Sequence, residues 1–338
     1  MGARLGIFTA LFALSCAGPS RAGLDPDREE GVHAESGADR WIEWWYHFGW
    51  LTDESGGEWA WVSSFFRYRH PGAPLTRYQI YDLIDLKTGL ADYHSRVGPE
   101  ALAPYAAFTG QVKLPPPHRL IEGDLREKAG DPLKLAYGDD TLERTGGRTY
   151  RLKAGPIDVD LRAASNVMAV EGTGLTGLKR PDDMHYYTIP RLVAEGSVRG
   201  KKARGLFWYD HQWGTSWVGV GWSWWGLQLE GGTHVNAYVL RDVKSGAVLR
   251  SVLTHDGGVV RLDAKPVDWW ESPAGVNYPI AWELSGGPFR LSIEPLFRER
   301  ACAIFGALKE IWEGPVRVKG SHSGRGFQEL VGYARDTK

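Results

Sequence analysis

Residues 208–232 read WYDHQWGTSWVGVGWSWWGLQLEGG and carry six of the 16 tryptophans of the 338-residue chain. Aromatic residues favour β-strands, and the glycines that interrupt this stretch favour tight turns. Tryptophan side chains are large and usually packed, so this density predicts an apolar cavity wall or a core seam. We therefore expect residues 208–232 to form the candidate site.

Short segments of strand-like composition, bounded by glycine, proline or aspartate, extend on both sides of this stretch. Residues 41–51 and 58–68 predict an aromatic hairpin, and residues 186–198 and 203–210 predict a second hairpin turning near Gly200 and Lys201. The 43 glycines are typical of an all-β protein. We expect helical or irregular structure only in residues 298–312, so the predicted fold class is all-β.

An internal sequence repeat indicates two related β units. Two tryptophans, two glycines, a strand and an Asp-Leu-Lys-Thr-Gly turn follow one another in residues 44–89, and a shorter version ending in Asp-Val-Lys-Ser-Gly occupies residues 224–246. The shared order favours tandem β units with a boundary near Thr215. We therefore predict an N-terminal domain of residues 40–215 and a C-terminal domain of residues 216–338. The tryptophan-rich stretch crosses their junction, where ligand pockets are common.

The N-terminus predicts export. Arg4 precedes the apolar residues 5–14 and then small residues, which indicates a signal peptide of residues 1–22 cleaved after Ala22, followed by a flexible leader of residues 23–39. A lipoprotein signal at Cys16 is the less favoured alternative. Without residues 1–22 the single cysteine left is Cys302, so no internal disulfide is expected. No later segment approaches transmembrane length, and we expect a periplasmic or secreted protein.

The charge pattern and the absent motifs exclude several function classes. The net charge is −1 and basic residues do not cluster beyond Lys201 and Lys202, which argues against a nucleic-acid partner. No Walker loop, dinucleotide fingerprint or G-x-S-x-G elbow stands between a strand and a helix, so no cofactor is expected. Nor is a metal centre expected, because these histidines are isolated in sequence: His47, His70, His94, His118, His234, His255 and His322.

Asp210 and His211 are the first candidates for chemistry, because a carboxyl group among indoles is costly to ionise and its pKa rises. Such a group suits a general acid. In the alternative interpretation Asp210 caps a turn and His211 faces solvent. The neighbours that favour the acid are Trp208, Trp213, Trp217 and Trp222.

His185 and Glu43 are further candidates. A hairpin centred near Gly200 and Lys201 would pair Asp210 with about Arg191, leaving His185 six residues further along, roughly 20 Å away on a straight strand. A bend at Pro190 would bring His185 closer. Otherwise His185 is a hydrogen-bonded residue at the start of a strand. Glu43 alternates with Ile42 and Trp44 and is expected to face outward.

Five segments, taken in order, resemble the AttH/CrtC family of lipocalin-like proteins, which includes carotenoid 1,2-hydratase and many exported bacterial proteins. They are Glu43-Trp44-Trp45-Tyr46, His185-Tyr186-Tyr187, Asp210-His211-Gln212-Trp213-Gly214, residues 222–232 and residues 326–333. The resemblance extends from about Arg40 to the C-terminus and implies two tandem lipocalin-like (calycin) β-barrels. It also implies that Asp210 donates a proton to an isoprenoid double bond, that His185 assists, and that Tyr187 and Trp208 are aromatic companions.

Two functions compete at this point. The first is an exported protein that binds a hydrophobic small molecule, isoprenoid or lipid, and resembles partners of lipid-handling ABC transporters. The alternative is a hydro-lyase that adds water to an isoprenoid double bond through Asp210. A third interpretation treats the tryptophans as core alone. The residues expected to contact the ligand are Tyr187, Trp208, His211, Trp213, Trp217, Trp222, Trp224 and Trp45.

Overall fold

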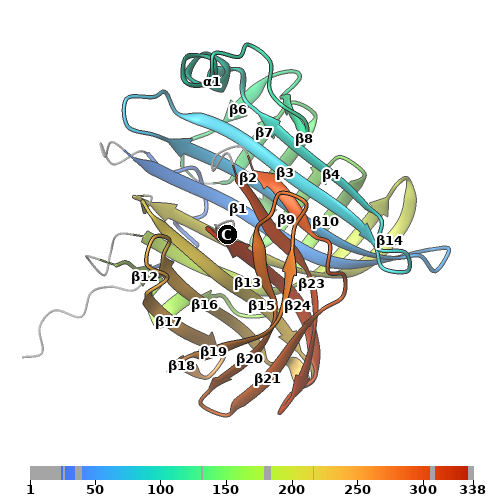
Figure 1. Ribbon diagram of the computed structural model, residues 1–338. Coiled ribbons are helices and arrows are strands. Elements are labelled where there is room, and N and C mark those ends of the chain that lie inside the picture. The colour runs from blue at the N-terminus through green and yellow to red at the C-terminus, as the bar shows by residue number, and fades with distance from the viewer. Residues whose placement is uncertain are drawn as a thin grey trace, which may run out of the picture.

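The computed structural model describes residues 24–25, 27–34, 40–130, 132–178, 184–215, 217–304 and 309–333. The predicted signal peptide, with Cys16, lies outside these residues. Two β-sheets, antiparallel apart from one short parallel pair, curl into half-barrels, one above the other in Figure 1. The all-β fold class is therefore confirmed, and the gap between the sheets falls between Gly214 and Val220.

The first sheet contains fourteen strands with the main order β5-β4-β3-β2-β1-β14-β13-β10-β9-β8-β7-β6, in which β11 and β12 also pair with β13. The first and last long strands, β1 and β14, are neighbours near its middle. The strands are β1 (Trp41–Asp53), β2 (Glu58–Arg69), β3 (Thr76–Asp85), β4 (Ala91–Val97), β5 (His118–Leu120), β6 (Leu125–Glu127), β7 (Lys134–Tyr137), β8 (Asp140–Gly146), β9 (Thr149–Ala154), β10 (Ile157–Ala163), β11 (Met168–Ala169), β12 (Leu175–Thr176), β13 (Met184–Val198) and β14 (Lys201–Gly214).

The second sheet contains ten strands in the order β18-β17-β16-β15-β24-β23-β21-β20-β19, with β22 paired to β23. Here too the first strand, β15, pairs with the last, β24. The strands are β15 (Val220–Leu229), β16 (His234–Asp242), β17 (Val248–His255), β18 (Gly258–Arg261), β19 (Asp263–Glu271), β20 (Asn277–Gly286), β21 (Phe289–Pro295), β22 (Ala301–Ile304), β23 (Lys309–Gly320) and β24 (Gly324–Val331).

Helical structure is minor, but it lies elsewhere than predicted. The described helices are α1 (Leu102–Thr109) and the 3-10 turns η1 (Pro99–Ala101), η2 (Val170–Gly172) and η3 (Glu230–Gly232). Residues 298–312 were expected to be helical or irregular, and their described part instead contains β22 and the start of β23, in which Cys302 and Ile304 alternate inward. None of the described helices has the length and apolar character needed to cross a membrane.

The β13–β14 hairpin corrects the predicted register. Its turn is at Arg199 and Gly200, with φ of 50° and 77°, one residue earlier than expected. The earlier turn moves the partner of Asp210 by two residues, from Arg191 to Ile189, and a bulge at Pro190 moves it by one more. Asp210 consequently lies opposite Thr188 and not Arg191.

Strand alternation divides the side chains among two barrel cores and one layer between them. Trp45 belongs to the first core and Trp225 to the second. Phe48 lies between the sheets, where its ring stacks on Trp208 at 5.5 Å and on Phe327 at 4.9 Å. This shared layer holds β1 and β14 against β15 and β24.

Residues 27–34 pack against the first barrel, although they were expected to belong to a flexible leader. Val32 forms isolated bridges with Ala129 and Gly130. The indole of Trp45 donates to the Glu30 carbonyl oxygen at 3.1 Å, and Arg144 pairs with the buried Glu30 carboxylate at 3.0 Å. Buried polar groups of this segment such as the Glu30 carboxylate find partners in the first barrel, and composition alone does not predict such long-range contacts.

Candidate functional site

A cavity of about 560 Å³ lies between the two sheets. Its walls come from β1, β2, β3, β12, β13 and β14 of the first sheet and from β15, β16, β22, β23 and β24 of the second, with residues 217–219 between them. A cavity of this volume, whose walls are mainly apolar and rich in aromatic residues, suits an apolar small molecule. Its aromatic residues are Trp44, Tyr46, Phe66, Tyr68, His70, Tyr78, Tyr186, Trp217, Trp222, Trp224 and Tyr238.

Asp210 is the carboxyl group that the first sheet presents to this cavity, and only 3% of the residue is exposed. Its Oδ1 accepts a hydrogen bond of 2.8 Å from the Trp208 indole, and its Oδ2 accepts one of 2.8 Å from the Tyr186 hydroxyl. Burial raises the pKa of Asp210 to about 7, although hydrogen bonds led by those from Tyr186 and Trp208 partly offset this rise. Asp210 can therefore carry a proton near neutral pH.

The Tyr186 hydroxyl connects the two sheets at this acid. It accepts hydrogen bonds from Trp224 Nε1 at 2.9 Å and from Asn236 Nδ2 at 2.8 Å, both on the second sheet. Trp224 Nε1 and Asn236 Nδ2 can only donate hydrogen bonds. The hydroxyl proton of Tyr186 must therefore point to Asp210. The position of the Asp210 carboxyl is thus determined by both halves of the molecule.

Two further carboxyl groups belong to the second sheet. Glu313 and Glu329 face each other across β23 and β24, and Glu329 lines the cavity. The Tyr46 hydroxyl donates to Glu313 Oε1 at 2.8 Å, and the Trp222 indole donates to Glu329 Oε1 at 3.1 Å. Burial raises the pKa of Glu313 to about 7, and burial followed by the charge of Glu313 raises that of Glu329 well above its usual range.

The structure separates the predicted site residues into two groups. Trp217, Trp222 and Trp224 line the cavity, and Trp208 lies behind Asp210 in the shared layer. The other members of the predicted ligand wall, Tyr187, Trp213, His211 and Trp45, lie on the opposite face of the first sheet, inside the barrel.

His185 belongs to this second group. It lies opposite Trp213 in the ladder and stacks on that indole at 4.9 Å. His185 is three residues from Thr188, the partner of Asp210, and an odd separation on a strand places two side chains on opposite faces. A contact between His185 and Asp210, which a bend at Pro190 would have allowed, is therefore excluded, since the sheet lies between the two side chains.

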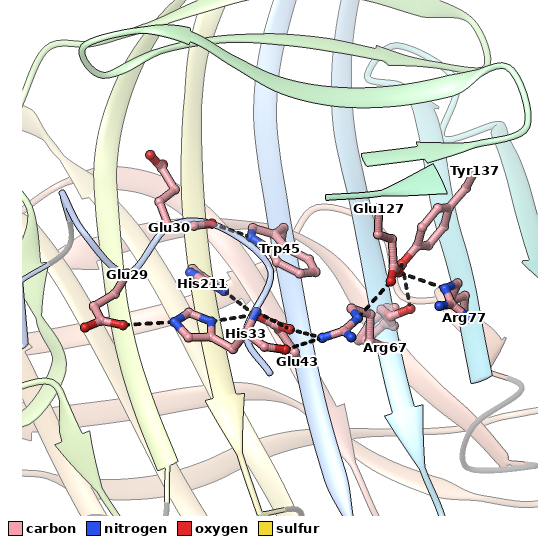
Figure 2. A network of polar contacts seen from close by, with 11 residues as sticks. Glu29, Glu30, His33, Glu43, Trp45, Arg67, Arg77, Glu127, Tyr137 and His211 are labelled. Carbon is pink, nitrogen blue, oxygen red and sulfur yellow. Dashed lines mark hydrogen bonds and ion pairs between the residues drawn. The ribbon is translucent and has the colours of Figure 1, made fainter. Parts of the chain in front are cut away.

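A second polar cluster occupies the interior of the first barrel (Figure 2). Glu43 is fully buried there, contrary to the expectation that it faces outward. Its Oε1 lies 2.7 Å from His33 Nδ1 and 3.2 Å from His211 Nε2, while Arg67 donates to its Oε2 at 2.6 Å. Burial opposes ionisation of Glu43, but hydrogen bonds from His211 and His33 outweigh it and lower the pKa to about 2.

Sequence reasoning missed the cavity residues Tyr46, Tyr186 and Glu329, and it missed their hydrogen-bond partners Glu313 and Asn236. A usable signal existed for the first sheet: Tyr186 and Asp210 stand at even positions that the hairpin aligns on one face. The second sheet offered none, because its contacts with Asp210 depend on how the two halves pack.

Comparisons with known proteins agree with this architecture. A family model described as AttH-like matches residues 106–333. Among curated proteins, kievitone hydratase of Fusarium solani subsp. phaseoli is 28% identical over 200 residues, which cover 52% of this chain and 56% of that protein. The chain thus spans about half the length of the curated relative it matches.

Two solved structures share the fold. A protein from Nitrosomonas europaea named for AttH superposes with a TM-score of 0.73 and 22% identity, over 94% of this chain and 98% of the other. Kievitone hydratase from Nectria haematococca superposes with a TM-score of 0.62 and 18% identity, over 86% and 89% of the two chains.

Proposed function

We propose that this chain, which belongs to the AttH-like family, is a hydratase that adds water to a carbon–carbon double bond of an apolar small molecule. The observation that carries the proposal is the buried Asp210 carboxyl, which faces an aromatic cavity with its pKa raised to about 7. The name of the relative kievitone hydratase supports the reaction class. We propose an isoprenoid-type, trisubstituted double bond as the reacting group.

In the first step the neutral Asp210 carboxyl transfers its proton to the less substituted alkene carbon. The alkene's electron pair forms the new C–H bond, which leaves a tertiary carbocation and the Asp210 carboxylate. Aromatic faces such as those of Trp44 and Trp224 stabilise a cation without reacting with it. Hydrogen bonds from Tyr186 and Trp208 stabilise the carboxylate as its charge develops.

In the second step a water oxygen bonds to the carbocation and loses one proton to the Asp210 carboxylate, which restores the acid. Glu329 lines the same cavity and is our candidate for holding this water. His185, which the resemblance implied would assist Asp210, lies across the sheet from it. The mainly apolar walls limit other water molecules from reaching the acid.

The test is incubation of the protein with a panel of apolar compounds that bear isoprenoid double bonds, followed by mass spectrometry. A product heavier by one water is expected for the wild-type protein, and labelled water should supply its oxygen. Asp210→Asn should lower the rate by about 10²- to 10⁴-fold, while quenching of tryptophan fluorescence shows that the ligand still binds. Wild-type protein that hydrates no member of the panel contradicts the proposal.

A binding function without catalysis is the second candidate, favoured by the number of indole and phenol groups around the cavity. Native protein would then yield a hydrophobic molecule on extraction, and Asp210→Asn would leave its recovery unchanged. Export is proposed with either function on the strength of the N-terminal sequence alone. Neither function requires a transporter partner.

A further inference from the structure

The cluster inside the first barrel has the composition of a metal centre. We propose that His33, Glu43 and His211 bind one divalent transition-metal ion, with zinc the best match. The ion would tie residues 27–34 to the barrel. This site lies on the face of β14 opposite the cavity, so the proposal is independent of the proposed reaction.

Three segments far apart in sequence bring the donor atoms together. His33 belongs to residues 27–34, Glu43 to β1 and His211 to β14. One atom from each, Nδ1, Oε1 and Nε2 respectively, lies within 4.8 Å of the others. Tetrahedral zinc with bonds of about 2.1 Å separates its ligand atoms by about 3.4 Å. Small side-chain rotations from the present 2.7 Å and 3.2 Å separations would reach that geometry.

Each proposed ligand is also held through its other polar atom. His33 Nε2 lies 3.0 Å from Glu29 Oε2, and His211 Nδ1 lies 3.3 Å from the Tyr187 hydroxyl. Arg67 holds Glu43 Oε2 and also donates to the His33 carbonyl oxygen at 2.9 Å. Outer partners of this kind fix the orientation of metal ligands in proteins. Figure 2 shows the Glu29 and Arg67 contacts.

The net charge of the cluster favours the binding of a cation. The connected carboxylates of Glu29, Glu43, Glu100 and Glu127 face two guanidinium groups, Arg67 and Arg77, so two negative charges are in excess. A bound divalent cation would offset this excess. Imidazole donors with one carboxylate favour zinc over magnesium or calcium.

The surroundings favour tight binding. The Trp213 ring stacks on His33 at 4.1 Å, and the Trp45 ring stacks on His211 at 4.9 Å. These indoles restrict water around the three ligand atoms. Local spacing rules could not find this centre, because His33 precedes Glu43 by ten residues and His211 follows it by 168.

The test uses the full chain, stripped with a chelator and then equilibrated with zinc chloride. After desalting, elemental analysis should find one zinc per wild-type chain, and cobalt substitution should give visible absorption bands. His33→Asn keeps an amide donor for Glu43 but is a poor metal ligand, so its zinc content should fall to near zero. His322→Asn, at a surface turn, is the matched control and should keep one zinc.

If His33→Asn does not fold, the thermal stability of the wild-type protein provides a second test. Zinc should raise the Tm of stripped wild-type protein by several degrees, because a ligand of the folded state stabilises it. The proposal is overturned if wild-type protein retains no zinc and its Tm does not respond. It is equally overturned if folded His33→Asn binds as much zinc as His322→Asn.

Discussion

The buried Asp210 carboxyl makes a prediction that needs no knowledge of the substrate. A rise of its pKa from the ordinary 3.8 to about 7 corresponds to about 4 kcal/mol. Below pH 3.8 the group is protonated in the folded and the unfolded protein and contributes no difference. Between pH 3.8 and 7 the folded protein holds more protons, so the free energy of unfolding falls as pH rises. Above about pH 7 the free energy of unfolding is lower by the full amount, because Asp210 is then ionised in both states.

Asp210→Asn removes this titration. The variant has a lower free energy of unfolding at every pH, because an amide group cannot accept hydrogen bonds from both Trp208 and Tyr186 as the carboxyl group does. The free energy of unfolding of Asp210→Asn, minus that of the wild type, should nevertheless increase by about 4 kcal/mol between pH 4 and pH 8. Urea unfolding followed by tryptophan fluorescence, at half-unit pH intervals, measures this difference.

Asp242→Asn is the matched control. Hydrogen bonds from the Ser245 backbone and side chain lower the pKa of Asp242, which lies at a surface turn. Its difference from the wild type should therefore stay constant above pH 5. A difference for Asp210→Asn that is equally constant from pH 4 to pH 8 would refute the reasoning, because Asp210 would then be ionised throughout.

Four shorter predictions concern the same architecture. The hydration rate should fall about tenfold per pH unit above pH 7, because only neutral Asp210 donates; a rate that rises there contradicts the mechanism. Tyr186→Phe removes a bond to the carboxylate, so the break in that pH–rate profile should move to higher pH, and a downward shift would be inconsistent. Phe48→Ala should cost about 3–5 kcal/mol in urea unfolding, and a loss below about 1 kcal/mol would show that the shared layer packs loosely. Arg144→Ala leaves the buried Glu30 without this counter-ion, so limited proteolysis within residues 27–34 should accelerate; unchanged cleavage argues against that anchor.

The sequence predicted what depends on local composition. Aromatic strands, glycine turns and the hairpins of β1–β2 and β13–β14 follow from neighbouring residues, and the all-β class follows from them. The expectation of an acid among indoles used the same information, since Trp208 and Asp210 stand two residues apart on one strand and their side chains share a face.

The strand partner of Asp210 and the contribution of the second sheet to the cavity could not be predicted, because they depend on strand register and on long-range packing. The turn at Arg199 and Gly200, together with the bulge at Pro190, displaced the predicted partner of Asp210 by three residues. An odd displacement reverses the face, which places His185 beside Trp213 and away from Asp210. Glu329 reaches the cavity only because β24 packs across from β14, and no local pattern encodes that contact.

The two faces of β14 have a practical consequence for protein engineering. Its even-numbered residues 208–212 face the space between the sheets, and its odd-numbered residues 209–213 face the barrel interior. A mutant library restricted to cavity-facing positions such as Trp44, Gln212 and Trp222 could therefore broaden substrate range while leaving both barrel cores intact. A single-residue insertion in β14 would instead turn the side chains that follow it to the opposite face of the sheet. Cavity-facing residues would then point into the barrel, and barrel-facing residues would point into the cavity.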